Sequence, residues 1–184
     1  MSEVLRFTGS QRRVAPWAAW SAVFACLVIS ISSLATERAG SVDEHYLEAL
    51  VGKWDMRGKL GGQPVRYHAA AVRVLQGGFV RLHMIDAAAV PQYEANLYLG
   101  FDAKAGDYVG HWLDRFGAAG ARVVATGHRD GEQLVLLFPY AEGAFRDTFT
   151  HHPAAKTWTL LIENQNADGT WVTYATYELK RVTN

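Results

Sequence analysis

Apolar and polar residues alternate in short segments of the chain from Lys53 onward. Successive side chains of a β-strand point to opposite faces, so each such segment predicts a strand with one buried face. In residues 53–60, every second position is charged. The positions between them form the expected inward face, which carries Trp54, Met56, Gly58 and Leu60.

Clusters of turn-forming residues interrupt the alternation and divide the domain into about ten short strands. Most clusters are short enough to be hairpins, which makes neighbouring strands antiparallel. Closing such a meander removes its unpaired edges, so we expect an all-β, up-and-down antiparallel barrel of about ten strands. The clusters fall at residues 61–62, 76–78, 102–106, 117–120, 130–131, 141–143, 153–155 and 168–169.

A short helix is expected before the first strand, over residues 42–50. Ser41 can cap its N-terminus, Asp43 and Glu44 suit the positive end of its dipole, and Gly52 ends it. We expect this helix to close one mouth of the barrel.

The first 35 residues have the layout of a secretory signal peptide. Arg12 and Arg13 precede an uncharged stretch at residues 14–36, within which Ser33-Leu34-Ala35 offers small residues at a cleavage position. We expect cleavage after Ala35 and a periplasmic or secreted protein. Retention as a membrane anchor is the alternative, because about 20 residues can span a bilayer. The arginine pair also leaves a twin-arginine signal open.

The expected domain organisation follows from these segments. Residues 1–35 form a signal peptide or anchor, residues 36–52 a linker with the short helix, and residues 53–184 the barrel. If the first segment is retained, it is the only part of the chain for which contact with a membrane is expected.

Composition narrows the function classes. The 18 Lys and Arg residues balance 18 Asp and Glu residues and form no basic block, so nucleic acid is not an expected partner. Cys26, the single cysteine, lies in the N-terminal segment. Its removal leaves no disulfide, thiol nucleophile or thiolate metal site. Lipidation of Cys26 is an alternative to its being an ordinary signal-peptide residue.

Both ends of the expected barrel carry a resemblance to known β-barrels. Leu50-Val51-Gly52-Lys53-Trp54 resembles the Gly-x-Trp opening of lipocalins and fatty-acid-binding proteins, the calycin group. Tyr177-Glu178-Leu179-Lys180-Arg181 places an arginine on the last strand. In calycins, such an arginine lies against that tryptophan and helps to close the barrel floor. The resemblance implies structural roles for Trp54 and Arg181.

The chain is also similar to a bacterial family catalogued as a domain of unknown function, for which a lipocalin-like barrel is expected. The strand around residues 145–152 matches the family only sparsely. The resemblance implies no reaction, because the family has none that could be carried over to this chain. The matching landmarks are Gly52-x-Trp54, Leu75-Gln76-Gly77-Gly78-Phe79, Leu99-Gly100-Phe101-Asp102, Tyr108 with Trp112-Leu113-Asp114, Asp130-Gly131, Asp168-Gly169, and Tyr177 with Arg181.

An imidazole, an indole and a carboxylate fall within one strand at His111-Trp112-Leu113-Asp114. Alternation puts Trp112 and Asp114 on one face and His111 on the other, which disfavours a His–Asp dyad within this strand. Asp114 is then expected at the inner rim, where it either orients a ligand or bonds to turn amides.

The seven histidines do not form a recognisable ligand set, because His151 and His152 are adjacent and the others stand apart. We therefore expect no metal and no cofactor. Haem, which needs one axial histidine in an apolar barrel, remains an alternative.

Three hypotheses for the function follow. The favoured one is a carrier or sensor that holds a small apolar or amphipathic molecule inside the barrel without catalysis. The alternatives are an isomerase, cyclase or lyase using His111, Asp114 or Arg146, and a structural envelope module whose barrel is filled by side chains. The expected ligand-binding residues are Met56, His83, Tyr98, Trp112, Arg146, Trp158 and Tyr177.

Overall fold

The structure, a computed structural model, describes residues 42–183. The expected signal peptide or anchor at residues 1–35, and its cleavage position, lie outside the described residues. Within residues 42–183, no helix combines the length and the apolar character needed to cross a bilayer.

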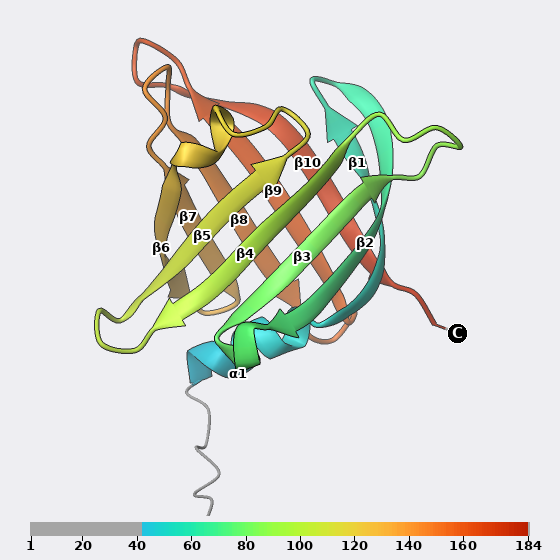
Figure 1. Cartoon of the computed structure of the whole chain (residues 1–184), viewed down its shortest axis with the longest axis vertical. Helices are drawn as coiled ribbons and strands as arrows, with labels where there is room; N and C mark the ends of the chain where they lie inside the picture. Colours follow the sequence, from blue (N-terminus) through green and yellow to red (C-terminus); the bar gives the residue numbers. More distant parts are fainter. Residues whose placement is uncertain (1–41, 184) are drawn as a thin grey trace, which may run out of the picture. The chain divides into compact units, whose positions relative to one another are not determined.

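Ten antiparallel strands form a closed barrel in which each strand pairs with its neighbours in the chain and β1 pairs with β10 (Figure 1). The up-and-down barrel and the short N-terminal helix expected from the sequence are thereby confirmed. The elements are α1 (Val42–Leu50), β1 (Gly52–Leu60), β2 (Gln63–Val74), β3 (Phe79–Asp86), β4 (Glu94–Asp102), β5 (Asp107–Asp114), β6 (Val124–Asp130), β7 (Gln133–Phe138), β8 (Phe145–His152), β9 (Thr157–Gln165) and β10 (Trp171–Arg181), with short 3-10 turns at Leu75–Gly77 and Gly120–Arg122.

The helix α1 lies across one end of the barrel (Figure 1). Its side chains Tyr46, Leu47 and Leu50 are buried, and the Tyr46 hydroxyl lies 3.2 Å from the carbonyl oxygen of Phe149 on β8. The indole N–H of Trp54 donates to the carbonyl oxygen of Leu50 at 2.8 Å. The helix thus closes one mouth of the barrel, as expected.

Arg181 fastens the last strand to this closed end. It is the cross-strand partner of Trp54, and its guanidinium carbon lies 4.4 Å from the centroid of the indole ring. The same guanidinium donates to the carbonyl oxygens of Val51 at 2.9 Å and Ala49 at 3.1 Å, where the helix leaves carbonyls unpaired. Gly52 makes room for it, since a Cβ at that position would collide with the guanidinium. The Gly-x-Trp motif and the terminal arginine therefore form one packing unit.

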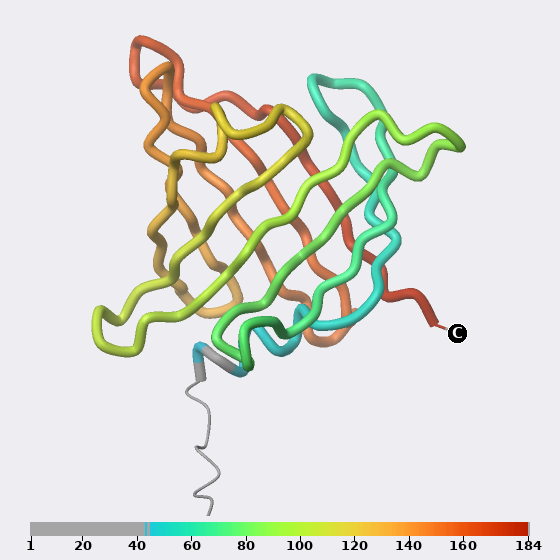
Figure 2. The backbone as a smooth tube through the Cα atoms, in the orientation of Figure 1, coloured from blue at the N-terminus to red at the C-terminus, as the bar shows by residue number. Residues whose placement is uncertain are grey.

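The barrel is filled with apolar side chains from its closed end to its middle. Their alternation along every strand reproduces the two-residue period of the sequence. The largest of the fully buried side chains include Trp54, Met56, Leu82, Leu97, Leu99, Leu134, Phe149 and Trp158. The connections run in two sets at the two ends of the barrel (Figure 2), and the set opposite α1 surrounds the site described next.

Candidate functional site

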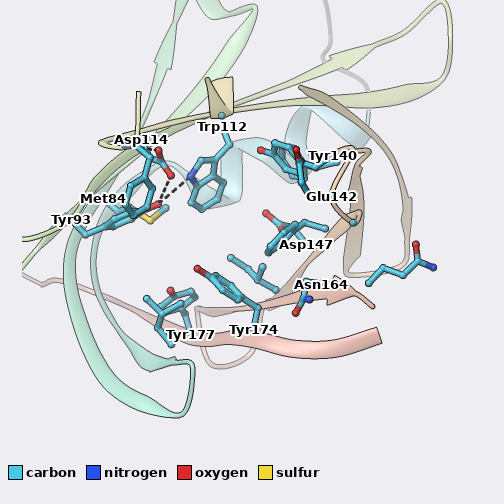
Figure 3. Close-up of a pocket in the computed structure, with 18 of the residues that line it drawn as sticks. Met84, Tyr93, Trp112, Asp114, Tyr140, Glu142, Asp147, Asn164, Tyr174 and Tyr177 are labelled. Atoms are coloured by element: carbon cyan, nitrogen blue, oxygen red, sulfur yellow. Dashed lines mark hydrogen bonds between the residues drawn. The ribbon is translucent and has the colours of Figure 1, made fainter. Parts of the chain in front are cut away.

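A cavity of about 410 Å³ occupies the half of the barrel opposite α1 (Figure 3). Its size falls within the range of about 300 to 1,000 Å³ that is usual for small-molecule pockets. The lining comes from the ends of the strands at this mouth and from the connections between them. It includes Leu60, Tyr67, Met84, Tyr93, Trp112, Asp114, Phe138, Tyr140, Glu142, Phe145, Asp147, Ile162, Asn164, Tyr174 and Tyr177.

Nine of the 19 residues that line the cavity are aromatic, and seven of these rings brace one another in two groups. In the first, the ring of Tyr67 lies 5.8 Å from those of both Tyr93 and Tyr177, at tilted angles. The second group runs through Phe138, Tyr140, Phe145 and Tyr174, with centroid distances of 6.1, 5.8 and 5.3 Å between successive rings. Edge-to-face and stacked pairs of this kind hold rings in place. The wall is therefore shaped before any ligand enters.

A short hydrogen-bond chain fixes the rim near β5. The Trp112 indole N–H donates to the Tyr93 hydroxyl at 3.2 Å, and that hydroxyl donates to one oxygen of Asp114 at 3.3 Å. The other Asp114 oxygen accepts from the backbone N–H of Phe116 at 3.0 Å. Burial raises the pKa of Tyr93, which keeps its hydroxyl protonated and able to donate. Asp114 thus bonds to a turn amide, one of the two roles expected for it.

Asp147 differs from Asp114 in having no partner. It is 3% exposed, and its cross-strand neighbours are the apolar residues Leu136 on β7 and Ile162 on β9. Its carboxyl points into the cavity (Figure 3), and no hydrogen bond or ion pair joins it to the described residues. Burial raises the pKa of Asp147 to about 8. Near neutral pH, the cavity therefore holds a carboxylic acid that is ready to gain or lose a proton.

The cavity has an acidic electrostatic character. Asp114, Glu142 and Asp147 belong to its lining, whereas Lys, Arg and His do not occur among the lining residues. Within residues 42–183, no three His, Cys, Asp or Glu side chains are grouped as metal ligands would be.

Comparison with known proteins gives a family and a fold. A family profile described as "Protein of unknown function (DUF1579)" matches residues 41–181. The chain belongs to this family. No match was found among curated proteins. The DUF1579 chain is similar to the protein in the crystal structure of Rv2717c from M. tuberculosis, with 15% sequence identity and a TM-score of 0.50 over 76% of this chain and 96% of that one.

At that identity, the similarity to Rv2717c concerns the fold alone. Together, the family and the similar structure support a barrel of unknown function. The resemblance to lipocalins and other calycins rests on the sequence motifs at residues 50–54 and 177–181 alone.

Three of the site residues expected from the sequence line the cavity of the DUF1579 barrel: Trp112, Asp114 and Tyr177. Met56 and Trp158 are buried deeper, in the packed half. Trp158 lies next to α1, where its indole N–H is 3.4 Å from the carbonyl oxygen of Ala49. Both residues face inward as alternation predicted, but distance along the strand places them below the cavity rather than in its wall.

Four other candidates lie on the outer face, which agrees with the alternation that put His111 opposite Trp112 and corrects the inward positions expected for the other three. His83 pairs with Glu94 at 2.8 Å, and His111 bonds to the carbonyl oxygen of Ala121 at 2.8 Å. Tyr98 stands between the inward residues Leu97 and Leu99, so its own side chain points outward.

Arg146 is the fourth of these candidates. It forms an ion pair with Glu163 at 2.7 Å and lies over the ring of Trp171 at 4.4 Å, outside the barrel. The strand position next to it, Asp147, is the one that faces the cavity. A His–Asp dyad at His111 and Asp114 does not form either, because the two side chains lie on opposite faces.

Sequence reasoning missed several lining residues. Tyr93 and Tyr140 lie in connections between strands, where no two-residue period applies. Tyr174 lies at a β-bulge, where the register of β10 shifts between Thr173 and Ala175. Beyond such a bulge, strict alternation no longer predicts which face of the sheet a side chain lies on. Asp147 did carry a signal, because its neighbours two positions away, Phe145 and Phe149, are both aromatic.

Proposed function

We propose that this DUF1579 protein binds a small, largely apolar or amphipathic molecule in the barrel cavity, as an exported carrier or sensor that needs no cofactor. The observation that carries the proposal is the cavity of about 410 Å³ with a wall of mutually braced aromatic rings. Such a wall offers a large apolar contact area. Because its side chains are already held in place, they lose little conformational entropy when a ligand binds.

The division of the barrel into a packed half and a hollow half supports binding over a purely structural role. The packed half already closes the floor and forms a continuous core. Aromatic side chains in the other half line a space instead of filling it. A module selected only for stability would gain from filling that space, because cavities lower stability.

The haem alternative is not supported by the lining residues. It requires an axial histidine inside the barrel, and histidine is not among the residues that line the cavity. His83 and His111 lie on strands that border the cavity, but their imidazole rings are hydrogen-bonded to Glu94 and Ala121 on the outer face of the barrel.

An apolar fluorescent probe tests the proposal. It should bind the purified protein in about a one-to-one ratio, quench the indole emission of Trp112 and raise the unfolding temperature by mass action. Trp112→Ala should weaken probe binding at least tenfold. Trp171→Ala is the matched control, because this indole lies over Arg146 outside the barrel and its loss should leave binding unchanged. Equal binding by wild type and Trp112→Ala would overturn the proposal.

Asp147 supports a second candidate function, an isomerase or lyase acting in the same cavity. A carboxyl with a pKa of about 8 can accept and return a proton near neutral pH. Mass spectrometry of small molecules released from the protein purified from its native envelope, before and after long incubation, separates the two functions. A carrier returns the molecule unchanged, whereas an enzyme converts it.

A further inference from the structure

The charge and the aromatic character of the cavity point beyond an unspecified apolar ligand. We infer that the cavity selects an organic cation, a protonated or quaternary amine on an apolar body, with its ammonium group held against Asp147 among the aromatic rings. This inference rests on the proposed binding function and specifies the class of ligand.

The first step of the argument is the position of Asp147. It is 3% exposed, its carboxyl points into the cavity (Figure 3), and its cross-strand neighbours Leu136 and Ile162 cannot bond to it. A buried carboxyl without a partner is unfavourable in the folded state. A cationic ligand would supply the missing partner in surroundings of low dielectric, where the pairing is strong.

The second step is the set of other ionisable groups around the same space. The acids are Asp114 on β5 and Glu142 in the connection between β7 and β8, and no lining residue carries a positive charge. The tyrosines are Tyr67, Tyr93, Tyr140, Tyr174 and Tyr177. A fatty acid or another anion would meet the acidic side chains of Asp114 and Glu142 without a counter-charge, and above about pH 8 an ionised Asp147 as well, so anionic amphipaths are disfavoured.

The third step concerns what the aromatic residues offer. The indole N–H of Trp112 is already used by the Tyr93 hydroxyl at 3.2 Å, so Trp112 presents ring surface to a ligand (Figure 3). Ring faces attract cations, and indole and phenol rings do so most strongly among the side chains. Aromatic rings around a carboxylate are therefore suited to an ammonium group and to the apolar chain attached to it.

Three probes with one apolar body and different head groups test the selectivity. At pH 8.5, 4-phenylbutylamine should bind at least tenfold more tightly than 4-phenylbutanol, and 4-phenylbutyrate should bind most weakly. If none of the three binds, the proposed binding function is itself overturned. If the alcohol or the acid binds as tightly as the amine, the cavity binds ligands but the inference about their charge is wrong.

A substitution at Asp147 tests the residue assignment. Asp147→Asn should remove most of the preference for the amine and leave alcohol binding within about threefold, which also shows that the variant is folded. Asp55→Asn, on the outer face of β1, removes one carboxylate of the same type and should leave the preference intact. A preference for the amine that survives Asp147→Asn overturns the assignment.

The pH dependence provides a measurement that needs no variant. The probe 4-phenylbutyltrimethylammonium keeps its charge at every pH, whereas Asp147, with a pKa of about 8, must lose its proton to pair with it. The association constant should fall about tenfold for each pH unit below this pKa and level off above it. Burial raises the pKa values of Tyr140 and Tyr177, so their hydroxyls do not titrate in this window. A constant that does not change between pH 6 and pH 9 overturns the inference.

Discussion

Among the described residues, Asp147 is the one carboxylic acid that the fold encloses almost completely. Its ionised form would be a largely buried charge without a partner among the described residues, so burial raises its pKa and the folded protein holds it mostly protonated at neutral pH. The same property that makes Asp147 a candidate for binding a cation makes it unfavourable for stability. A buried group of this kind is expected where function, rather than packing, decides the residue.

Replacing Asp147 with Asn should remove a pH dependence from the free energy of unfolding. The pKa is about 8 in the folded protein and about 3.9 in an unfolded chain. Between those values, the folded state alone holds the proton. The free energy of unfolding of the wild type should therefore fall relative to that of Asp147→Asn by about 1.4 kcal/mol per pH unit as pH rises from about 4 toward the folded pKa, and the difference should level off above that pKa.

Urea unfolding of the wild type and Asp147→Asn at intervals from pH 5 to pH 8.5 measures this difference. The wild type should lose stability relative to the variant as pH rises. Asp55→Asn is the control. Arg66 and Arg57 lower the pKa of the Asp55 carboxyl, so this substitution should change the pH dependence of the free energy of unfolding only at acid pH. If the free energies of unfolding of the wild type and Asp147→Asn changed in parallel with pH, the pKa of the Asp147 carboxyl would not be raised by burial in the folded protein.

At the scale of single residues, the sequence predicted the orientation of a side chain correctly where alternation along its strand was used. Alternation put Trp112 and Asp114 on one face, and both line the cavity, whereas Tyr98, His83 and Arg146, chosen for their chemistry, face outward. Whether an inward acid has a partner depends on what the adjacent strands place opposite it. For Asp147 those residues are Leu136 and Ile162, and no local pattern reveals their pairing.

At the scale of elements, the strands and the helix could be predicted and the cavity could not. Strand alternation and turn chemistry are local, so the ten strands and α1 follow from the sequence. Much of the cavity wall comes from connections, such as those that carry Tyr93 and Tyr140, and from the bulge at Tyr174. Their orientation depends on how the whole barrel closes.

The attachment of α1 to the barrel should depend on Arg181. Its guanidinium donates to the carbonyl oxygens of Ala49 and Val51 and covers the Trp54 ring. Arg181→Ala should speed amide hydrogen exchange in the last turn of α1 at least tenfold while leaving the middle strands protected. Lys180→Ala is the matched control, since Lys180 pairs with Glu178 on the outer face. Unchanged exchange in Arg181→Ala would contradict a holding role for this arginine.

The N-terminal segment should direct export. Residues 1–40, fused to a reporter that is active only outside the cytoplasm, should give activity, because the arginine pair, the apolar stretch and Ser33-Leu34-Ala35 occur in the order of a signal peptide. A fusion that starts at residue 36 is the control. Replacing Arg12 and Arg13 with Lys keeps the charge and distinguishes a general signal from a twin-arginine one. An inactive native fusion would refute export by this segment.

At the scale of the molecule, the barrel has two halves with different properties. The half next to α1 is filled by apolar side chains and locked by Trp54 and Arg181. The opposite half holds the cavity, and its rim leaves Phe116 75% exposed. Stability and binding therefore depend on largely different residues of one closed sheet, although the buried side chains of Tyr67, Met84, Phe138, Ile162 and Tyr177 belong to both the core and the cavity wall.

This separation predicts opposite responses to mutation in the two halves. Leu97 is fully buried in the packed half, so Leu97→Ala should lower the free energy of unfolding by roughly 2 to 5 kcal/mol. The molecules that remain folded should bind an apolar probe as the wild type does. Tyr140 is only partly buried and lines the cavity, so Tyr140→Ala should weaken probe binding at least tenfold and lower the free energy of unfolding by less than Leu97→Ala does. Urea unfolding and probe titration on both variants measure the four quantities. If Tyr140→Ala destabilised the fold as strongly as Leu97→Ala and left binding intact, the rim aromatics would belong to the structural core, and the barrel would be better explained as an envelope module than as a carrier.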